Sequence, residues 1–106
     1  MITMFETLQD KVLNWAKEKG ILDNSNPLKQ LEKTQEELDE TKEALERGGD
    51  NDNDVADGIG DMLVTIIILA ELAGLDSVEC LRLAYKEIKD RKGEMRDGLF
   101  VKEDNL

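Results

Sequence analysis

The stretch Met62-Leu63-Val64-Thr65-Ile66-Ile67-Ile68-Leu69-Ala70 is the most apolar part of the chain. Thr65 interrupts it and Glu71 ends it, so it falls well short of the ~20 residues that span a bilayer. We therefore expect a buried helix rather than a membrane span. Apolar residues cover more than one side of this helix, and such a helix needs neighbours all around it. A chain of this length supplies too few other helices to cover it on every side, and the sequence therefore predicts self-association.

Outward from this stretch, helical periodicity divides the chain into four helices and a short turn-rich tail: residues 4–19, 27–47, 53–73 and 77–92, then 94–106. N-cap residues and glycine stops mark the helix ends: Thr3, Asn26, Asp76, Gly20 and Gly74. Aromatic residues make up only 4% of the chain and helix formers dominate, which predicts an all-α class. We expect residues 1–106 to form one domain, a four-helix bundle completed by oligomerisation.

Several side chains are expected in the helical core because they recur at helical spacing. They comprise a stripe on the second helix and three residues elsewhere: Leu28, Leu31, Leu38 and Leu45, with Trp15, Tyr85 and Cys80. Trp15 has a second interpretation, since its ring could stack on a base if it lay near a pocket. Cys80 is the only cysteine, which excludes an intrachain disulfide and fits a reducing compartment.

The net charge of −11 argues against one broad class of partner. Proteins that bind polynucleotides use clustered cations to displace counterions, so we expect no nucleic-acid strand as a partner. The amino terminus reaches Glu6 after five residues without a basic segment followed by an apolar one, so we expect no signal peptide. With no membrane span predicted either, the sequence predicts a cytoplasmic protein.

Two acidic clusters stand out: Glu36-Glu37-Leu38-Asp39-Glu40 and Asp57-Gly58-Ile59-Gly60-Asp61. Successive helical residues turn by about 100°, so one polar face of the second helix, within an arc of roughly 80°, comprises Gln30, Lys33, Glu37 and Glu40. By the same rule one face of the third helix, within roughly 60°, carries Asp54, Asp57 and Asp61, and the aliphatic Val64 and Ile68 continue it. We therefore expect Asp61 to be drawn towards the interior, where an unpaired charge is costly.

Converging carboxylates either take up protons or gather cations, because like charges ~4 Å apart repel by about 4 kcal/mol at an effective dielectric near 20. The chain has no histidine, so oxygen-only ligation indicates Mg²⁺, Mn²⁺ or Ca²⁺. Solvated acidic faces are the alternative, since 25 acidic residues in 106 place some at helical spacing by chance. A ferritin-like di-iron site needs histidine, and an EF-hand loop starting at Asp50 would need glycine and glutamate where the chain has Val55 and Asp61.

The order and spacing of these residues are similar to those of a known family. Gln30-x-x-Lys33-x-x-Glu36-Glu37-x-x-Glu40 followed by Asp57-x-x-x-Asp61 resembles the MazG-like nucleotide pyrophosphohydrolases of the all-α NTP pyrophosphatase superfamily. Three segments resemble the bacteriophage-type branch: residues 57–64, 84–93 and 97–102. The resemblance runs from about Trp15 to Asp104. It implies a helical enzyme that hydrolyses nucleoside triphosphates to a monophosphate and pyrophosphate with Mg²⁺, assembled as a homodimer or homotetramer.

Carried over by position, the resemblance implies that Glu37 and Glu40 ligate the metal, since they match the second and third glutamates of the family's EExxE motif. Glu36 matches the first. The family's second motif is ExxD, in which Asp61 matches the aspartate while Gly58 stands at the glutamate position. Asp57 reaches the same helix face as Asp61, so we assign it the role of the missing ligand, with Asp54 in reserve.

Hydrolysis of this kind depends on neutralising charge around phosphorus and aligning a water, tasks suited to Mg²⁺, or Mn²⁺ in its place, on carboxylates. Glu36 or Glu37 is the predicted acceptor of the water's proton. The predicted substrate contacts are Gln30, Lys33, Lys89, Arg91 and Lys92. Two alternatives remain from other classes: a metal-stabilised helical bundle with weak or no catalysis, and an acidic module that binds a basic protein partner.

Overall fold

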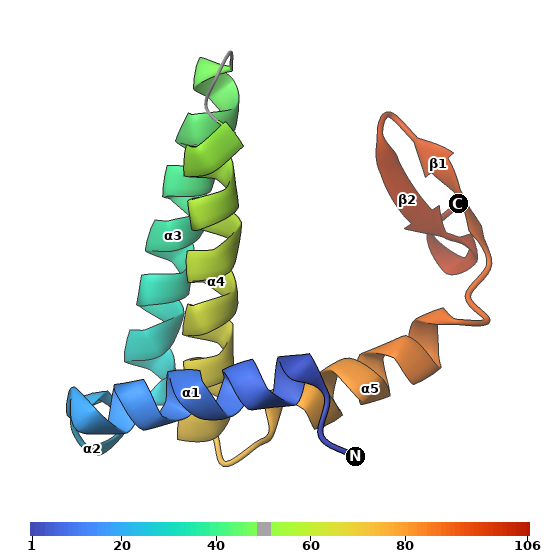
Figure 1. Ribbon diagram of the computed structural model, residues 1–106. Coiled ribbons are helices and arrows are strands. Elements are labelled where there is room, and N and C mark those ends of the chain that lie inside the picture. Colours follow the sequence, from blue (N-terminus) through green and yellow to red (C-terminus); the bar gives the residue numbers. More distant parts are fainter. Residues whose placement is uncertain (49–51) are drawn as a thin grey trace.

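The computed structural model describes residues 1–48 and 52–106 and is mostly helical (Figure 1). Its helices are α1 (Met4–Glu18), α2 (Ile21–Asn24), α3 (Pro27–Arg47), α4 (Asp52–Leu72) and α5 (Ser77–Ile88). A hairpin of β1 (Gly93–Arg96) and β2 (Leu99–Lys102) follows, and a 3₁₀ turn, Glu103–Asn105, ends the chain. The four predicted helices are therefore confirmed, although the last ends at Ile88 instead of residue 92. The break predicted between the helices at residues 27–47 and 53–73 lies partly outside the described residues.

Local capping explains where the helices begin. The side chain of Thr3 accepts a hydrogen bond from the Glu6 amide at 3.1 Å, and Asn26 accepts one from the Lys29 amide at 2.9 Å, just before Pro27. These bonds satisfy amides that have no partner within their own helix. Asp76 caps α5 and also accepts a hydrogen bond from the buried side chain of Gln9, so the same aspartate ties α1 to the start of α5.

The centre of the molecule is the antiparallel pair of α3 and α4, which α1 crosses at one end (Figure 1). The two helices approach closely at Gly58, where an added Cβ would lie 2.3 Å from Thr41 Oγ1. Four of the buried apolar residues, Ala16, Ile67, Ile68 and Ala70, belong to α1 and to the end of α4 that α1 crosses, while Ala44 is buried nearer the other end of the α3–α4 pair. This part of the apolar stretch is therefore buried, as the sequence predicts.

A single chain does not close into a compact bundle. Its α5 and hairpin extend away from the α3–α4 pair (Figure 1), and the radius of gyration is 16.3 Å against about 13 Å expected for this length. The leucine stripe predicted for the core is exposed: Leu28, Leu31, Leu38 and Leu45. The core prediction is also wrong for Trp15, Tyr85 and Cys80, which are exposed as well. These side chains lie on faces of α1, α3 and α5 that no element within residues 1–48 and 52–106 covers.

The carboxyl-terminal residues form a hairpin instead of the predicted turn-rich tail. Asp97 and Gly98 both have positive φ, at 51° and 83°, which is the geometry of a type I′ turn. The turn sets the register, in which Met95 lies opposite Phe100. Asp-Gly between short apolar runs is a strong hairpin signal, so this element was predictable from the sequence.

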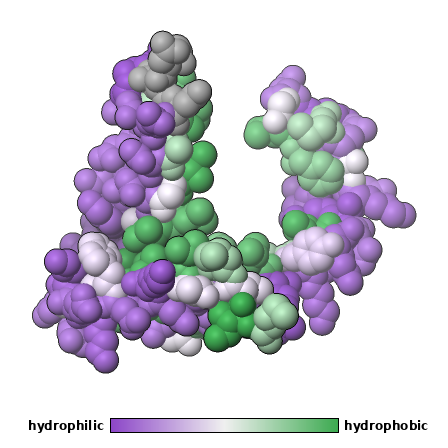
Figure 2. Space-filling view, viewed as in Figure 1, coloured by the Kyte–Doolittle hydropathy of each residue, from purple (hydrophilic) through white to green (hydrophobic). Residues whose placement is uncertain are grey.

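Apolar side chains are exposed on α4 and on the hairpin, where these two parts of the structure face each other. Figure 2 shows apolar side chains on the side of α4 that faces the hairpin, and on the side of the hairpin that faces α4. Across the described residues, no single helix is long and apolar enough to cross a membrane. Asn53–Leu72 and Ser77–Ile88, bent by 100°, pass that test only as a pair, by length and composition.

Candidate functional site

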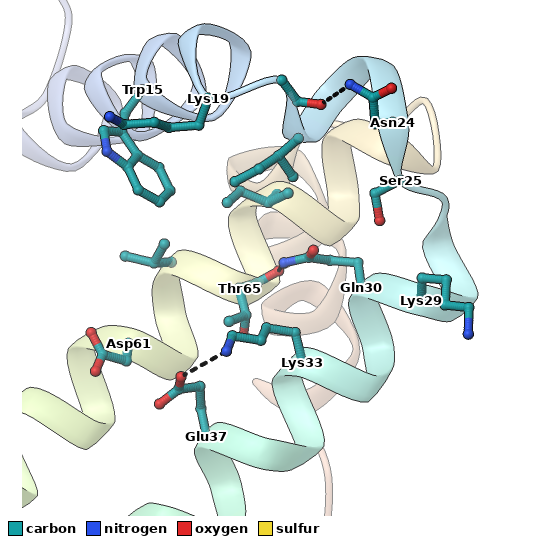
Figure 3. Close-up of a pocket in the computed structure, with 14 residues that line it drawn as sticks. Trp15, Lys19, Asn24, Ser25, Lys29, Gln30, Lys33, Glu37, Asp61 and Thr65 are labelled. Carbon is teal, nitrogen blue, oxygen red and sulfur yellow. Dashed lines mark hydrogen bonds and ion pairs between the residues drawn. The ribbon is translucent and has the colours of Figure 1, made fainter.

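A pocket of about 670 Å³ opens where α1 and α2 meet the α3–α4 pair (Figure 3). Trp15 reaches it from α1, Lys33 and Glu37 from α3, and Asp61 from α4. The aliphatic side chains Ile21, Val64 and Ile68 complete its apolar wall. A pocket of this size, largely apolar with a few polar groups, is typical of small-molecule sites.

Glu37 is the less exposed of the two carboxylates that line the pocket. Its side chain is only 12% exposed, and its Oε2 is buried with no hydrogen-bond partner among the described residues. Burial, reinforced by the nearby carboxylates of Glu40 and Asp61, raises the pKa of Glu37 above its ordinary value. A partly buried carboxylate surrounded by like charge is the condition in which a proton or a cation is gained.

Lys33 stands one turn before Glu37 and supplies the cation nearest to it. Its Nζ lies 3.9 Å from Glu37 Oε1 and 3.3 Å from Glu36 Oε2. The hydrogen bond to Glu36, with the charges of the neighbouring glutamates, raises the pKa of Lys33. Glu36 is half-exposed and does not line the pocket, so its contact with the site runs through Lys33.

Gln30 forms the floor of the pocket. Its side chain is buried, and its Nε2 donates a hydrogen bond of 3.2 Å to the backbone carbonyl of Thr65 on α4 (Figure 3). The Thr65 hydroxyl in turn donates to the carbonyl of Met62 at 2.7 Å. Gln30 therefore links α3 to α4 as well as lining the pocket.

The remaining predicted ligands line a second, smaller concavity of about 190 Å³ between α3 and α4. Its carboxylates are Glu40, Asp54, Asp57 and Asp61, beside Gly58 and Arg47. Arg47 pairs with Asp54 at 3.3 Å, so one of these charges is already partly neutralised. Asp61 lines both concavities and is exposed, so the expectation that it is drawn into the interior is wrong.

The carboxylates of Glu40 and Asp61 thus lie close enough to Glu37 for their charges to interact with it. Asp57 lines the smaller concavity together with Asp61. Within residues 1–48 and 52–106, however, no three acidic, cysteine or histidine side chains converge closely enough to hold a metal in their present positions. Metal ligation by this set would therefore need side-chain rotation around Asp61.

The three other predicted phosphate contacts lie elsewhere in the chain. Lys89 follows the end of α5, and Arg91 and Lys92 line a separate concavity of about 370 Å³ beside the end of the hairpin. None of these three side chains forms an ion pair with a carboxylate in the described part of the chain. A single chain therefore does not place them beside the carboxylates of α3 and α4 (Figure 1).

Sequence reasoning missed part of the pocket wall. Lys19, Asn24 and Ser25 line it because the chain reverses at Gly20, whose φ is +78°, and then forms the short helix α2. Asn24 Nδ2 donates a hydrogen bond of 2.7 Å to the Gly20 carbonyl, which holds this turn together. The glycine was a readable stop signal, but the return of the following residues towards α3 was not.

Comparisons with protein-family models, with curated proteins and with solved structures gave no match.

Proposed function

We propose that this chain is a MazG-like nucleoside triphosphate pyrophosphohydrolase that cleaves its substrate to a monophosphate and pyrophosphate with Mg²⁺. The observation that carries the proposal is the buried Oε2 of Glu37, which has no hydrogen-bond partner in the described part of the chain. It belongs to a carboxyl group whose pKa is raised by burial and by Glu40 and Asp61, at the wall of a nucleotide-sized pocket. A divalent cation relieves both the desolvation and the repulsion.

The pocket chemistry suits a nucleotide. Trp15 offers an exposed ring for stacking a base, an interaction worth roughly 1–3 kcal/mol. Lys19 and Lys33 supply positive charge for phosphates, although Lys33 also pairs with Glu36 at 3.3 Å. Lys29 is paired with Glu32 at 3.4 Å. The amides of Asn24 and Gln30 provide polar contacts between these two regions.

The donor set fits Mg²⁺, which prefers carboxylate oxygens. Glu37, Glu40 and Asp61 are the residues that would hold it, and Asp57 would join them through rotation into the smaller concavity. When bound, the ion neutralises charge on the phosphates and favours attack by water. Glu37 is better placed than Glu36 to accept the water's proton, because Glu36 lies outside the pocket and pairs with Lys33.

Assembly into a homodimer or homotetramer, with the bundle completed by neighbouring chains, is part of this proposal. One chain exposes 8357 Å², whereas a compact monomer of 12.0 kDa exposes roughly 6,000 Å². The excess, about 2,400 Å² per chain, is of the size that obligate homodimers bury. Large exposed apolar side chains on every long helix support the same conclusion.

The test is incubation of the purified protein with each nucleoside triphosphate and Mg²⁺, with products separated by ion-exchange chromatography. We expect pyrophosphate and a monophosphate in equal amounts, and orthophosphate with a diphosphate would refute the proposal. Glu40→Gln should lose activity and keep its fold. Glu43→Gln is the matched control, because Glu43 is an exposed carboxylate of α3 that lines neither concavity.

Absence of turnover with every nucleotide would leave the two alternatives. They differ in thermal melting with Mg²⁺, because a structural metal stabilises the folded state by mass action. A rise in melting temperature would indicate a metal-stabilised bundle, and an unchanged value would indicate an acidic interaction module.

A further inference from the structure

Among the described residues, Lys33 is the basic side chain that both lines the pocket and pairs with Glu37. Its Nζ lies 3.3 Å from Glu36 Oε2 and 3.9 Å from Glu37 Oε1, so one ammonium group contacts two consecutive glutamates of α3. These two partners differ in environment, since the Glu36 side chain is 56% exposed and that of Glu37 only 12%. Lys33 therefore pairs with one carboxylate at the surface and with another at the pocket wall.

The charges around Glu37 are unbalanced. The Lys33 ammonium lies on its pocket side, and in Figure 3 the Glu37 carboxylate points towards it. The carboxylates of Glu40 and Asp61 are also close enough to interact with Glu37, and Glu36 shares the same lysine. Carboxylates thus outnumber the ammonium group here, and such a cluster attracts further positive charge. A divalent cation that enters the pocket meets Lys33 already in contact with Glu37.

We propose that Lys33 is an internal counter-ion of Glu37 that competes with the divalent cation, and that Lys33 turns to the phosphates of the substrate when the cation takes this carboxylate. This role rests on the proposed function. Competition lowers the apparent affinity of the site for metal, because only molecules in which Glu37 is free of Lys33 are ready to bind it. The metal charge in turn repels an ammonium group held about 4 Å from Glu37.

The lysine side chain suits such an exchange of partners. Its four-carbon stem is flexible and its ammonium group has three donors, so Lys33 can leave Glu37 while Glu36 keeps it beside the pocket. Coupling of this kind is reciprocal: if metal binding releases Lys33 for the phosphates, phosphates that hold Lys33 favour metal binding by the same factor. We therefore expect metal and triphosphate to bind cooperatively through this residue.

Lys29 is a matched control one turn earlier on α3. It also lines the pocket and also forms an ion pair with the glutamate three residues ahead, Glu32, at 3.4 Å. Glu32 lines neither the pocket nor the smaller concavity between α3 and α4. Lys29→Met therefore removes the same charge from the same helix without releasing Glu37.

Metal binding alone tests the competition. Mn²⁺ binding to the full chain, measured from the paramagnetic resonance signal of the free ion, should be roughly fivefold tighter for Lys33→Met than for the parent, the upper end for a partly exposed ion pair. Lys33→Arg keeps the cation and should bind Mn²⁺ like the parent, as should Lys29→Met. Equal or weaker binding by Lys33→Met, or tightening of the same size by Lys29→Met, would overturn the proposal.

The movement of Lys33 to the triphosphate is tested by calorimetry with saturating Mg²⁺. The ligands are the α,β-methylene analogues of ATP, CTP, GTP and UTP, which the proposed reaction does not cleave. Lys33→Met should weaken their binding by roughly tenfold, near the lower end for a hydrogen bond to a charged group, whereas Lys29→Met should change it little. The same substitution then moves metal and nucleotide affinity in opposite directions, which a merely structural role would not do.

The two measurements separate the possible failures. Tighter Mn²⁺ binding by Lys33→Met with unchanged nucleotide affinity would refute the movement to the phosphates. Analogues that bind to none of the proteins would refute the proposed function and that movement, while the competition measured with Mn²⁺ would stand. Absence of Mn²⁺ binding by the parent and by Lys33→Met alike would refute the metal site, and with it the competition.

Discussion

Gly58 of α4 lies directly against Thr41 of α3. A Cβ built on Gly58 would be 2.3 Å from Thr41 Oγ1 and 3.1 Å from Thr41 Cβ, distances at which something must move. The Thr41 hydroxyl is itself held by a 2.8 Å hydrogen bond to the carbonyl of Glu37. The position at which the resembled family has a metal-binding glutamate is therefore a helix-packing position in this chain.

Gly58→Ala should destabilise the protein by up to about 2 kcal/mol. Overpacking a tight contact typically costs about 1–3 kcal/mol, and the better helix propensity of alanine returns about 1 kcal/mol. Gly60→Ala is the matched control on the same helix, because its Cβ would meet nothing within 4 Å, and it should stabilise by up to about 1 kcal/mol. Urea unfolding of both variants measures the difference. Equal effects of the two substitutions would show that the Thr41 contact is not tight.

Gly58→Glu tests whether this helix-packing position can also hold a metal-binding glutamate. Restoring the glutamate of the ExxD motif should lower stability further and should not raise hydrolysis, because the larger side chain separates α3 from α4 next to Glu37. The measurement is the rate of pyrophosphate release beside the urea midpoint of the same variant. Higher activity at unchanged stability would mean that the site has room for a fourth ligand at this position.

Helix ends were predictable because their causes are local. Thr3, Asn26 and Asp76 each cap a helix through a backbone amide three residues ahead, and Gly20 and Gly74 adopt the positive φ expected of stop residues. Which face of a helix is buried is not a local property. The leucine stripe of α3 obeys helical spacing, yet the chain packs the neighbouring side, with Gln30, Thr41 and Ala44, against α4.

Glu37→Gln should stabilise the metal-free protein while abolishing its hydrolysis. The substitution removes a partly buried charge that repels Glu40 and Asp61, the arrangement that raises the pKa of Glu37. A gain in stability is expected, because the neutral amide avoids both the desolvation of the charge and its repulsion by the neighbouring carboxylates. Differential scanning calorimetry in EDTA measures it. Exposed Glu43→Gln is the control and should change the melting temperature by much less.

The raised pKa of Glu37 should also make the stability of the metal-free protein depend on pH. Because its pKa is raised in the folded state, Glu37 binds a proton more readily there than in the unfolded chain. The contribution of the protonated Glu37 carboxyl group to folding stability is fully present below its unfolded pKa and is lost as pH rises through its folded pKa. The stability difference between the metal-free parent and Glu37→Gln should therefore widen as pH increases from 4 to 7. A constant difference over this range would contradict the assignment.

The candidate site was only partly readable from sequence, for a physical reason. Spacing placed Glu37 and Glu40 on one helix and Asp57 and Asp61 on another, but it gave no rotation of one helix relative to the other. That rotation is set by the Gly58–Thr41 contact, and it turns Glu37 towards one concavity and Asp57 towards another. Spacing also gave no distance between these carboxylates and Arg91, which depends on where α5 and the hairpin lie.

Trp15 provides the most direct report on nucleotide binding, because it is the only tryptophan, lines the pocket and is 46% exposed. Its fluorescence should change when a nucleoside triphosphate binds in the presence of Ca²⁺, which takes carboxylate oxygens as ligands. Trp15→Ala should weaken binding about tenfold, measured by calorimetry, since stacking is worth roughly 1–3 kcal/mol. Trp15→Phe should retain most of the affinity, because it keeps an aromatic face. Affinity that is equal in all three proteins would show that the base does not stack on Trp15.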